Sequence, residues 1–306
     1  MENIVVTVLC FAYNHGKYIK DALDGFVNQK TNFKYEVLVH DDKSTDNTAE
    51  IIAEYAEKYP DIIKPMYEEE NQYSQGKLIY KIMLPYVRGK YVATCEGDDY
   101  WCDNSKLQKQ VDFMESNPDY VLCAHNTKFH NQENGKKSAI YSTKDRDIKI
   151  EDAVTGMGKC YHTSSVLYKK ELLVDRPEFT SMIPGVGDYP FAVYATLQGK
   201  VKYFSDVMSV YRYMVEGSWT DKNVHDNKKA AKIYENSIKM LEAANEWSDK
   251  KYDDVFKKGI LYRRFDRATV IKDYDEILSD DLKSILTFKL RFKYRLMKTL
   301  SCLLRK

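Results

Sequence analysis

The sequence lacks the features that would place it in several large classes of protein. Its 306 residues contain no run of about 18 apolar residues, the length that spans a bilayer. Lys and Arg number 47 against 46 Asp and Glu, so no excess of positive charge indicates nucleic acid as a partner. The start, Met1-Glu2-Asn3, has no basic region or cleavage pattern of a signal peptide. We therefore expect a cytoplasmic protein, either soluble or peripheral on the inner face of the membrane.

Metal-binding and redox patterns of cysteine are also missing. The six cysteines form no CxxC pair and no zinc-type spacing with histidine. Several lie in apolar runs, where a reduced thiol behaves as a small hydrophobic side chain. No GxGxxG follows the first apolar run, which argues against a NAD-binding enzyme. A Gly-rich loop bearing Arg or Lys is missing there too, which argues against a sugar nucleotidyltransferase.

What the sequence does have is an alternation of strand and helix patterns as far as residue 118. Short apolar runs rich in β-branched residues predict strands at 4–11, 35–40, 62–67 and 91–95. Apolar residues at helical spacing predict helices within 19–27, 51–59, 76–87 and 107–114. This alternation predicts an α/β fold with a doubly wound, mostly parallel central sheet flanked by helices.

The pattern changes in the rest of the chain. Strands are expected at 121–129, at 138–141 after the hairpin turn Asn134-Gly135, and at 160–168 and 201–211. Helices are expected near 151 and from 187 to 199, a polar loop at 214–223, and helices throughout the remainder. We therefore expect one domain over residues 1–220 and a C-terminal helical extension over 221–306.

The final stretch, residues 282–306, contains Lys and Arg but no Asp or Glu. Its leucines and other apolar residues recur at roughly helical spacing. A basic amphipathic helix is typical of a segment that lies on a membrane surface or docks on a partner. The alternative is a helix packed on its own domain, with its lysines reaching into solvent.

Carboxylates gather where the predicted strands end. One strand stops at Glu96-Gly97-Asp98-Asp99, another stops at Asp41-Asp42, and Tyr13 follows the first. Because ligands collect beyond the carboxyl ends of such strands, we expect these residues to converge on one crevice. Unpaired carboxylates are costly to bury, and their oxygens suit Mg²⁺ or Mn²⁺, which typically arrive with phosphate. A solvated acidic turn is the alternative.

Three segments carry a family resemblance: the strand ending in Ala12-Tyr13-Asn14, the element from Asp41 to Thr48, and Glu96-Gly97-Asp98-Asp99 with the aromatic pair that follows. Together they resemble the inverting family 2 glycosyltransferases with the GT-A fold, over roughly residues 3 to 220. The resemblance implies an enzyme of bacterial glycan synthesis that is metal-dependent, with Mn²⁺ or Mg²⁺. It would move a hexose or N-acetylhexosamine from a UDP-sugar to a hydroxyl of a glycan or lipid-linked glycan. A degenerate sugar-nucleotide-binding or scaffold protein is the alternative.

The resemblance also implies roles for individual residues. The nucleotide-sugar would be bound by Phe11, Ala12, Tyr13, Asp41, Lys77, Glu96, Gly97 and Asp98. Within this set Tyr13 would lie against uracil, Asp41 would accept the uracil N3–H, and Lys77 would approach the phosphates. The expected metal ligands are Asp98 and Asp99. Glu96 stands where the family has the first aspartate of its DxD motif, a departure that affects a ribose or metal contact.

The expected catalytic base is Asp188, which would take the proton of the acceptor hydroxyl. Its position before a helix also suits an acid that stabilises the helix dipole. His162 and Trp219 are candidates for the acceptor side, although each is also explained by a structural role. The loop after the last strand, Met214 to Asn223, lacks the histidine that many members of the family carry there.

Overall fold

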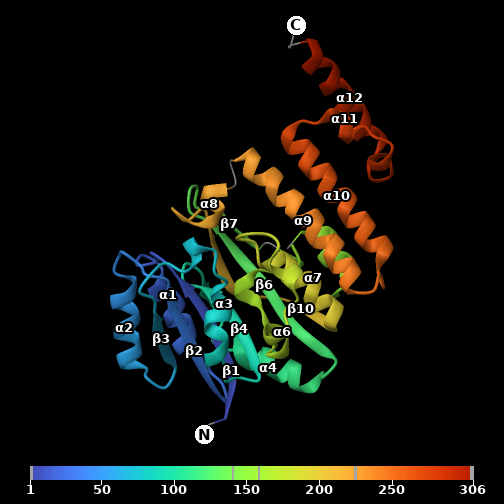
Figure 1. The fold of residues 1–306 in the computed structure, drawn as a ribbon. Helices are drawn as coiled ribbons and strands as arrows, with labels where there is room; N and C mark the ends of the chain where they lie inside the picture. The colour runs from blue at the N-terminus through green and yellow to red at the C-terminus, as the bar shows by residue number, and fades with distance from the viewer. Residues whose placement is uncertain (1–2, 140, 158, 224–225, 304–306) are drawn as a thin grey trace. The chain divides into compact units, whose positions relative to one another are not determined.

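The computed structural model describes residues 3–139, 141–157, 159–223 and 226–303 (Figure 1). The chain divides into two compact units. The first comprises residues 1–149, 158–176 and 195–215, and the second comprises residues 150–157, 177–194 and 216–306. The division into domains at residue 220 stays a prediction.

The first unit is built on one mixed sheet with the strand order β3-β2-β1-β4-β9-β6-β10-β5. Its strands are β1 (Ile4–Ala12), β2 (Lys34–Asp41), β3 (Ile63–Tyr67), β4 (Tyr91–Glu96), β5 (Tyr100–Trp101), β6 (Tyr120–Asn131), β7 (Lys137–Ala139), β8 (Arg146–Ile148), β9 (Leu167–Lys169) and β10 (Lys200–Tyr213). The strands β3, β2, β1 and β4 pair in parallel, whereas β9 is antiparallel to both its neighbours. The α/β class with a helix-flanked central sheet is confirmed, and its parallel pairs are β1–β2, β1–β4, β2–β3 and β6–β10.

The helices of the first unit pack apolar stripes against this sheet. They are α1 (Ile19–Val27), α2 (Thr48–Lys58), α3 (Ile79–Met83), α4 (Lys106–Ser116) and α6 (Glu171–Val174), with 3₁₀ turns at 73–75, 84–86 and 163–165. In α1, Ile19, Leu23 and Phe26 follow the helical repeat and are fully buried. Phe26 meets the ring of Trp101 edge-on at 4.8 Å, which joins α1 to the turn that follows β4.

Three predicted elements differ from the structure. The strand expected at 160–168 is reduced to β9, because the side chain of His162 accepts from the N–H of Ser164 and starts a 3₁₀ turn. The helix expected over 76–87 is only α3, since Pro85 lies in a separate 3₁₀ turn. The loop expected over 214–223 ends in the short helix α8 (Trp219–Asn223).

The second unit is helical, as expected for the C-terminal region. Its elements are α5 (Ile150–Gly156), part of α7 (Asp188–Gln198), α8, α9 (Asn227–Trp247), α10 (Asp253–Ile271), α11 (Tyr274–Ile277) and α12 (Phe288–Leu303), with 3₁₀ turns at 178–181 and 281–285. A small core of Ala268, Ile277, Leu286 and Tyr294 joins α10, α11 and α12. The basic stretch at 282–306 is therefore a 3₁₀ turn followed by a helix, and its last three residues lie outside the described part. None of the described helices is both long and apolar enough to cross a bilayer.

Candidate functional site

The ends of three parallel strands meet at one edge of the first unit's sheet. In the register of β1 with β2, Ala12 lies opposite Asp41. In the register of β1 with β4, Phe11 lies opposite Glu96. The parallel pairing therefore brings together residues that are far apart in the chain.

The loops after β1 and β2 are fastened to each other by hydrogen bonds. Asn14 adopts a left-handed backbone with φ of 56°, and its N–H donates to Ser44 Oγ at 2.9 Å. The N–H of Thr45 donates back to Asn14 Oδ1 at 2.7 Å. Asparagine tolerates this backbone conformation better than most residues do. The two loops thus fix the position of Tyr13, whose side chain is left largely exposed.

The adjacent buried residues Asp41 and Asp42 have different partners. Asp41 accepts from its neighbour Ser44, with 2.5 Å between Oδ1 and Oγ. Asp42 instead accepts from the backbone N–H groups of Gln72 and Tyr73, at 2.7 and 3.0 Å. The Nζ atom of Lys77 donates to Gln72 Oε1 at 2.5 Å, so this lysine lies beside the segment that Asp42 holds.

Glu96, Asp98 and Asp99 form what we call the acidic cluster, in which one carboxylate oxygen of each lies within 4.8 Å of the others. Asp98 and Asp99 are buried and Glu96 is exposed. Asp99 Oδ1 accepts from the N–H of Arg212 at 2.9 Å, but its buried Oδ2 has no hydrogen-bond partner. Burial, reinforced by the charges of Asp98 and Glu96, raises the pKa of Asp99 well above its ordinary value. Oxygen ligands with an unpartnered buried oxygen fit a hard divalent cation such as Mg²⁺ or Mn²⁺.

Gly97 lets the acidic cluster sit tightly against β1 and α1. Its N–H donates to the carbonyl of Phe11 at 2.8 Å. A Cβ at this position would lie 2.7 Å from Ile19 Cδ1 and 2.8 Å from His15 Nδ1. His15 also faces the cluster, with Nε2 3.9 Å from Asp98 Oδ2. The glycine is therefore required by close packing between two carboxylates and the first helix.

Arg212, on β10, is a residue of this site that the sequence analysis missed. Its Nη1 donates to the carbonyl of Asp98 at 2.7 Å, and its guanidinium lies 4.5 Å from the centre of the Tyr100 ring. A second guanidinium nitrogen pairs with Asp21. The only sequence signal was a single charge in the otherwise uncharged run from Met208 to Met214.

His162 also lies against the acidic cluster. Its Nδ1 is 3.7 Å from Asp99 Oδ2 and 2.8 Å from Ser164 Oγ, and its ring stacks on Tyr211 with 4.2 Å between centroids. Burial lowers the pKa of His162 to about 3, so the imidazole is neutral at physiological pH. His162 is thus a partly buried, hydrogen-bonded histidine beside the cluster.

Asp188 and Trp219 belong to the second unit and are described there alone. Asp188 is the first residue of α7, and its Oδ1 accepts from the N–H of Tyr189 at 2.8 Å. Burial raises the pKa of Asp188, and this backbone donor partly opposes the shift. Both the predicted base and a helix-stabilising acid are compatible with these contacts. Trp219 begins α8 and is 38% exposed.

Comparison with known sequences identifies relatives over most of the chain. Residues 7–175 match the family model described as glycosyl transferase family 2. An uncharacterized protein of Mycobacterium tuberculosis is 33% identical over 217 residues, which are 70% of this chain and 60% of the relative. The putative teichuronic acid biosynthesis glycosyltransferase TuaG of Bacillus subtilis is 36% identical over 110 residues, 36% of this chain and 42% of TuaG. The alignment thus spans well under the full length of these relatives.

Solved structures with a similar fold cover nearly the whole chain. The TarS 1–349 structure from S. aureus, in complex with UDP-GlcNAc, has a TM-score of 0.66 at 18% identity and covers 97% of this chain and 88% of that one. The mannosyltransferase PcManGT from Pyrobaculum calidifontis, in complex with GDP-Man and Mn²⁺, has a TM-score of 0.53 at 16% identity, covering 96% and 86%. At these identities the likeness shows a shared fold.

Proposed function

The chain belongs to glycosyl transferase family 2 and has the GT-A fold, and from this premise we propose that it is an inverting transferase that moves a hexose or N-acetylhexosamine from a UDP-sugar to a hydroxyl of a cell-surface glycan. The observation that carries the proposal is the meeting of Ala12, Asp41 and the acidic cluster at one sheet edge. The complex of TarS with UDP-GlcNAc supports a UDP-sugar donor, and that of PcManGT with GDP-Man supports a sugar nucleotide more generally.

The residues around β1 would bind the nucleotide. Tyr13 is exposed enough to lie against a base, and the buried carboxylate of Asp41 would accept the uracil N3–H. Phe11, Ala12 and Gly97 form the backbone floor between these groups, since Gly97 is hydrogen-bonded to Phe11. Lys77 would swing from Gln72 to the diphosphate.

The acidic cluster would hold a divalent cation, Mn²⁺ or Mg²⁺. When bound, the cation would neutralise the diphosphate that leaves. Asp98 and Asp99 would be its ligands, and the unpartnered Oδ2 of Asp99 supports that assignment. Glu96 is the exposed member of the cluster and would face the ribose. Arg212 would keep the backbone of Asp98 in place through its hydrogen bond to the carbonyl.

Asp188 would act as the general base that removes the proton from the acceptor hydroxyl. Attack from the side opposite the diphosphate inverts the anomeric centre in one displacement. The raised pKa of Asp188 suits a base that must accept a proton near neutral pH. His162 and Trp219 would contact the acceptor.

A screen of UDP-, GDP- and dTDP-sugars for hydrolysis, with Mn²⁺, with Mg²⁺ and with a chelator, tests the proposal. We expect release of UDP only in the presence of metal. Asp188→Asn should reduce transfer roughly 10²–10⁴-fold while leaving the affinity for UDP nearly unchanged. Binding of UDP without turnover by the unaltered protein would instead favour a degenerate binding or scaffold protein.

We also propose that α12 holds the enzyme at an anionic membrane surface, where a lipid-linked acceptor would be reached. Phe288 is 84% exposed, and Phe292, Leu296 and Leu300 follow it at four-residue spacing with exposed fractions of 63, 53 and 50%. This spacing puts the four side chains on one face of the helix. The opposite face is covered, since Leu290 and Tyr294 pack in the core of α10–α12.

The charge of the same segment suits an anionic membrane surface better than a neutral partner surface. Residues 282–306 contain no acidic side chain, and a basic residue near an anionic leaflet contributes about 1 kcal/mol. In a flotation experiment the protein should therefore rise with anionic vesicles. The double variant Phe288→Ser, Phe292→Ser should stay in the bottom fraction. Val174→Ser, at an exposed apolar residue of α6, is the matched control. Equal flotation of both variants would contradict the proposal.

A further inference from the structure

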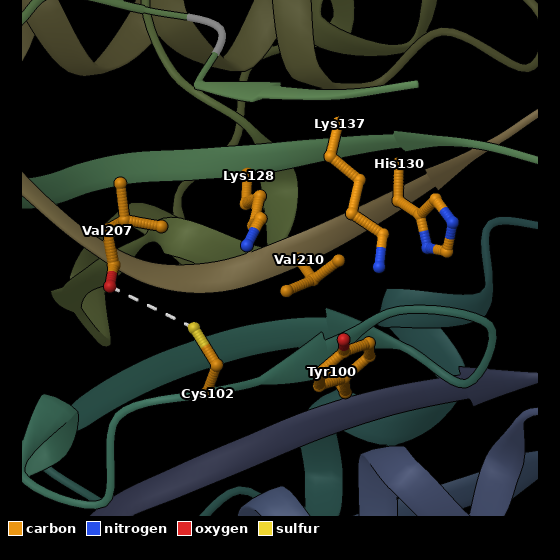
Figure 2. Close-up of a pocket in the computed structure, with 7 residues that line it drawn as sticks. All are labelled: Tyr100, Cys102, Lys128, His130, Lys137, Val207 and Val210. Atoms are coloured by element: carbon orange, nitrogen blue, oxygen red, sulfur yellow. Dashed lines mark hydrogen bonds between the residues drawn. The ribbon is translucent and has the colours of Figure 1, made fainter. Parts of the chain in front are cut away.

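Directly after the acidic cluster in the chain, Tyr100 forms one wall of a pocket of about 210 Å³. We call this the basic pocket, because every ionisable nitrogen that lines it belongs to lysine or histidine. Its lining residues are Tyr100, Cys102, Lys128, His130, Lys137, Val207 and Val210. In Figure 2 the side chains of Lys128, His130 and Lys137 extend toward the side on which Tyr100 and Cys102 lie.

Strand register explains why these basic groups converge. Lys128 and His130 are two residues apart on β6 and therefore point to the same face. Lys137 on β7 lies directly opposite His130 in the antiparallel ladder, which puts it on that face too. Val210 on β10 pairs with Lys128 on one side and with Tyr100 on the other. Strands from separate parts of the chain thus build the pocket.

The lysines of the basic pocket form no ion pair with the acidic side chains that the structure describes. Neither Lys128 nor Lys137 has an acidic partner there, although the carboxylate of Asp103 acts on Cys102 and contributes to its raised pKa. Burial and the charges of Lys137, Arg212 and Lys128 lower the pKa of His130, so the neutral imidazole is favoured and the positive charge of the pocket comes from the lysines. An anion in the hollow would be attracted by both ammonium groups at once.

The basic pocket shares a wall with the proposed donor site. The guanidinium of Arg212 lies over the ring of Tyr100, and its Nη1 donates to the carbonyl of Asp98. The donor's own diphosphate has a separate means of neutralisation, the cation proposed for the acidic cluster. An anion in the basic pocket would therefore belong to the other substrate.

We propose that the basic pocket binds a phosphate group of the acceptor, so that this enzyme acts on a phosphate-bearing glycan or glycan precursor. The inference rests on the proposed transferase function. Lys128 and Lys137 supply ammonium charges, a form in which lysine commonly binds phosphate. The hydroxyl of Tyr100 supplies a further donor. Because these lysines are exposed to solvent, the affinity for inorganic phosphate alone should be in the millimolar range.

Cys102 is an exposed thiol in the lining and offers a direct probe of the pocket's charge. Iodoacetate is an anion and iodoacetamide is neutral, and both alkylate the thiolate with loss of iodide. The ratio of the two rates cancels the fraction of thiolate and reports local potential. Peptide mapping of Cys102 in the full chain should give a ratio that falls about fivefold in the double variant Lys128→Gln, Lys137→Gln. Inorganic phosphate should lower the ratio in the unaltered protein and not in the variant.

Matched variants separate charge from folding. Lys136→Gln alters an exposed lysine next to Lys137 that does not line the pocket, and it should leave the ratio unchanged. Lys128→Arg with Lys137→Arg should retain the high ratio, because arginine keeps the positive charge. A ratio that is the same in the Gln and unaltered proteins, or no effect of millimolar phosphate, would overturn the proposal.

Two further arms identify the source of the phosphate. UDP with Mn²⁺ should lower the alkylation ratio at Cys102 less than inorganic phosphate does. In the Gln variant the effect of phosphate on the ratio should be lost, whereas the affinity for UDP should change less. If UDP affinity falls as far as phosphate protection, the lysines belong to the donor's diphosphate and the proposal is wrong. The alkylation assay needs no sugar nucleotide. A protein without transferase activity that keeps the phosphate effect would therefore contradict the proposed function and not the phosphate site.

Discussion

The acidic cluster ends at Asp99 and the wall of the basic pocket begins at the next residue, Tyr100, yet the protein holds the charges of the two regions in opposite ways. Asp98 and Asp99 are buried, and Asp99 accepts a hydrogen bond from the backbone N–H of Arg212. Lys128 and Lys137 extend from a β-ladder into solvent. Burial makes an uncompensated charge expensive, whereas an exposed charge is screened and costs little. The cluster is thus suited to a cation that stays for the reaction, and the pocket to an anion that comes and goes.

Arg212 connects these two regions. Its backbone N–H binds Asp99 and its side chain binds the backbone of Asp98, so it fixes the shape of the acidic turn without occupying the carboxylate oxygens left for a metal. The same guanidinium stacks on Tyr100, a wall of the basic pocket. A substrate bound in the pocket would therefore contact, through Tyr100, the turn that carries the proposed metal ligands.

The largest expected effect comes from removing a charge of the cluster. Asp98→Asn should lower turnover roughly 10²–10³-fold, since a lost metal ligand removes several kcal/mol of charge stabilisation. It should also abolish the Mn²⁺ dependence of UDP binding in calorimetry. Asp103→Asn is the control, because Asp103 is an acid on the same segment that pairs with Lys109. If the two variants lowered turnover equally, Asp98 would have no larger role than an acid at the surface.

The strand ends of this site were predictable from the sequence, because their determinants are local. Buried parallel strands give continuous apolar runs, and each run stops close to a residue for which we propose a role in donor binding: Tyr13, Asp41 and Glu96. Parallel pairing then requires the ends to meet, and the registers of β1 with β2 and β4 confirm that they do. Gly97 was found with the motif, although its reason, contact with Ile19 and His15, needed coordinates.

Residues that depend on distant pairing could not be found in the same way. Arg212 reaches Asp99 only because β10 pairs with β5 across more than a hundred residues of chain. The basic pocket depends on the ladders that join β6 to β7 and β10, whose registers no local pattern reveals. The strand predicted at 160–168 was wrong for a local reason. The side chain of His162 accepts from a backbone N–H that a strand would use in its ladder.

A second prediction tests how tightly the cluster is packed. Gly97→Ala would place a Cβ against Ile19 and His15, and overpacking of this kind costs about 1–3 kcal/mol. We expect a lower Tm and about tenfold weaker UDP binding with Mn²⁺, because the displaced turn carries Asp98. Adding Ile19→Val removes the Cδ1 atom that the new methyl meets and should restore part of both losses. The absence of any rescue would show that the packing argument is wrong.

A third prediction tests whether burial, rather than the sign of the charge, explains the difference between the acidic cluster and the basic pocket. Lys106 is a fully buried cation whose ammonium donates to Gln110 at 2.8 Å and lies 3.9 Å from the Trp101 ring centre. Burial lowers the pKa of Lys106 to about 7. Between pH 7 and the pKa of this lysine in the unfolded chain, the unfolded chain therefore binds more protons than the folded one. The free energy of unfolding should therefore rise by about 2 kcal/mol from pH 7 to 9 on this group's account.

Lys106→Met should remove that rise, as measured by urea unfolding at several pH values. Lys109→Met, three residues away, should keep it, because Lys109 is exposed and its partner Asp103 raises its pKa. Retention of the full pH dependence in the Lys106 variant would mean that the buried ammonium is not the group that titrates. The proposed difference in energetic cost between buried and exposed charges in this unit would then lose its support.

The smallest expected effect compares the two regions under salt. Screening shortens the range of a charge from about 8 Å at physiological ionic strength to about 3 Å at 1 M, and it acts far more on exposed groups than on buried ones. The iodoacetate-to-iodoacetamide ratio at Cys102 should therefore fall toward that of the Gln variant as NaCl is raised. The affinity for UDP with Mn²⁺ should fall by a smaller factor, because Asp98 and Asp99 are shielded from solvent ions. If the alkylation ratio and the affinity for UDP fall by the same factor, the cluster is as open to solvent as the pocket. The proposed difference between a cation that is retained and an anion that exchanges would then be wrong.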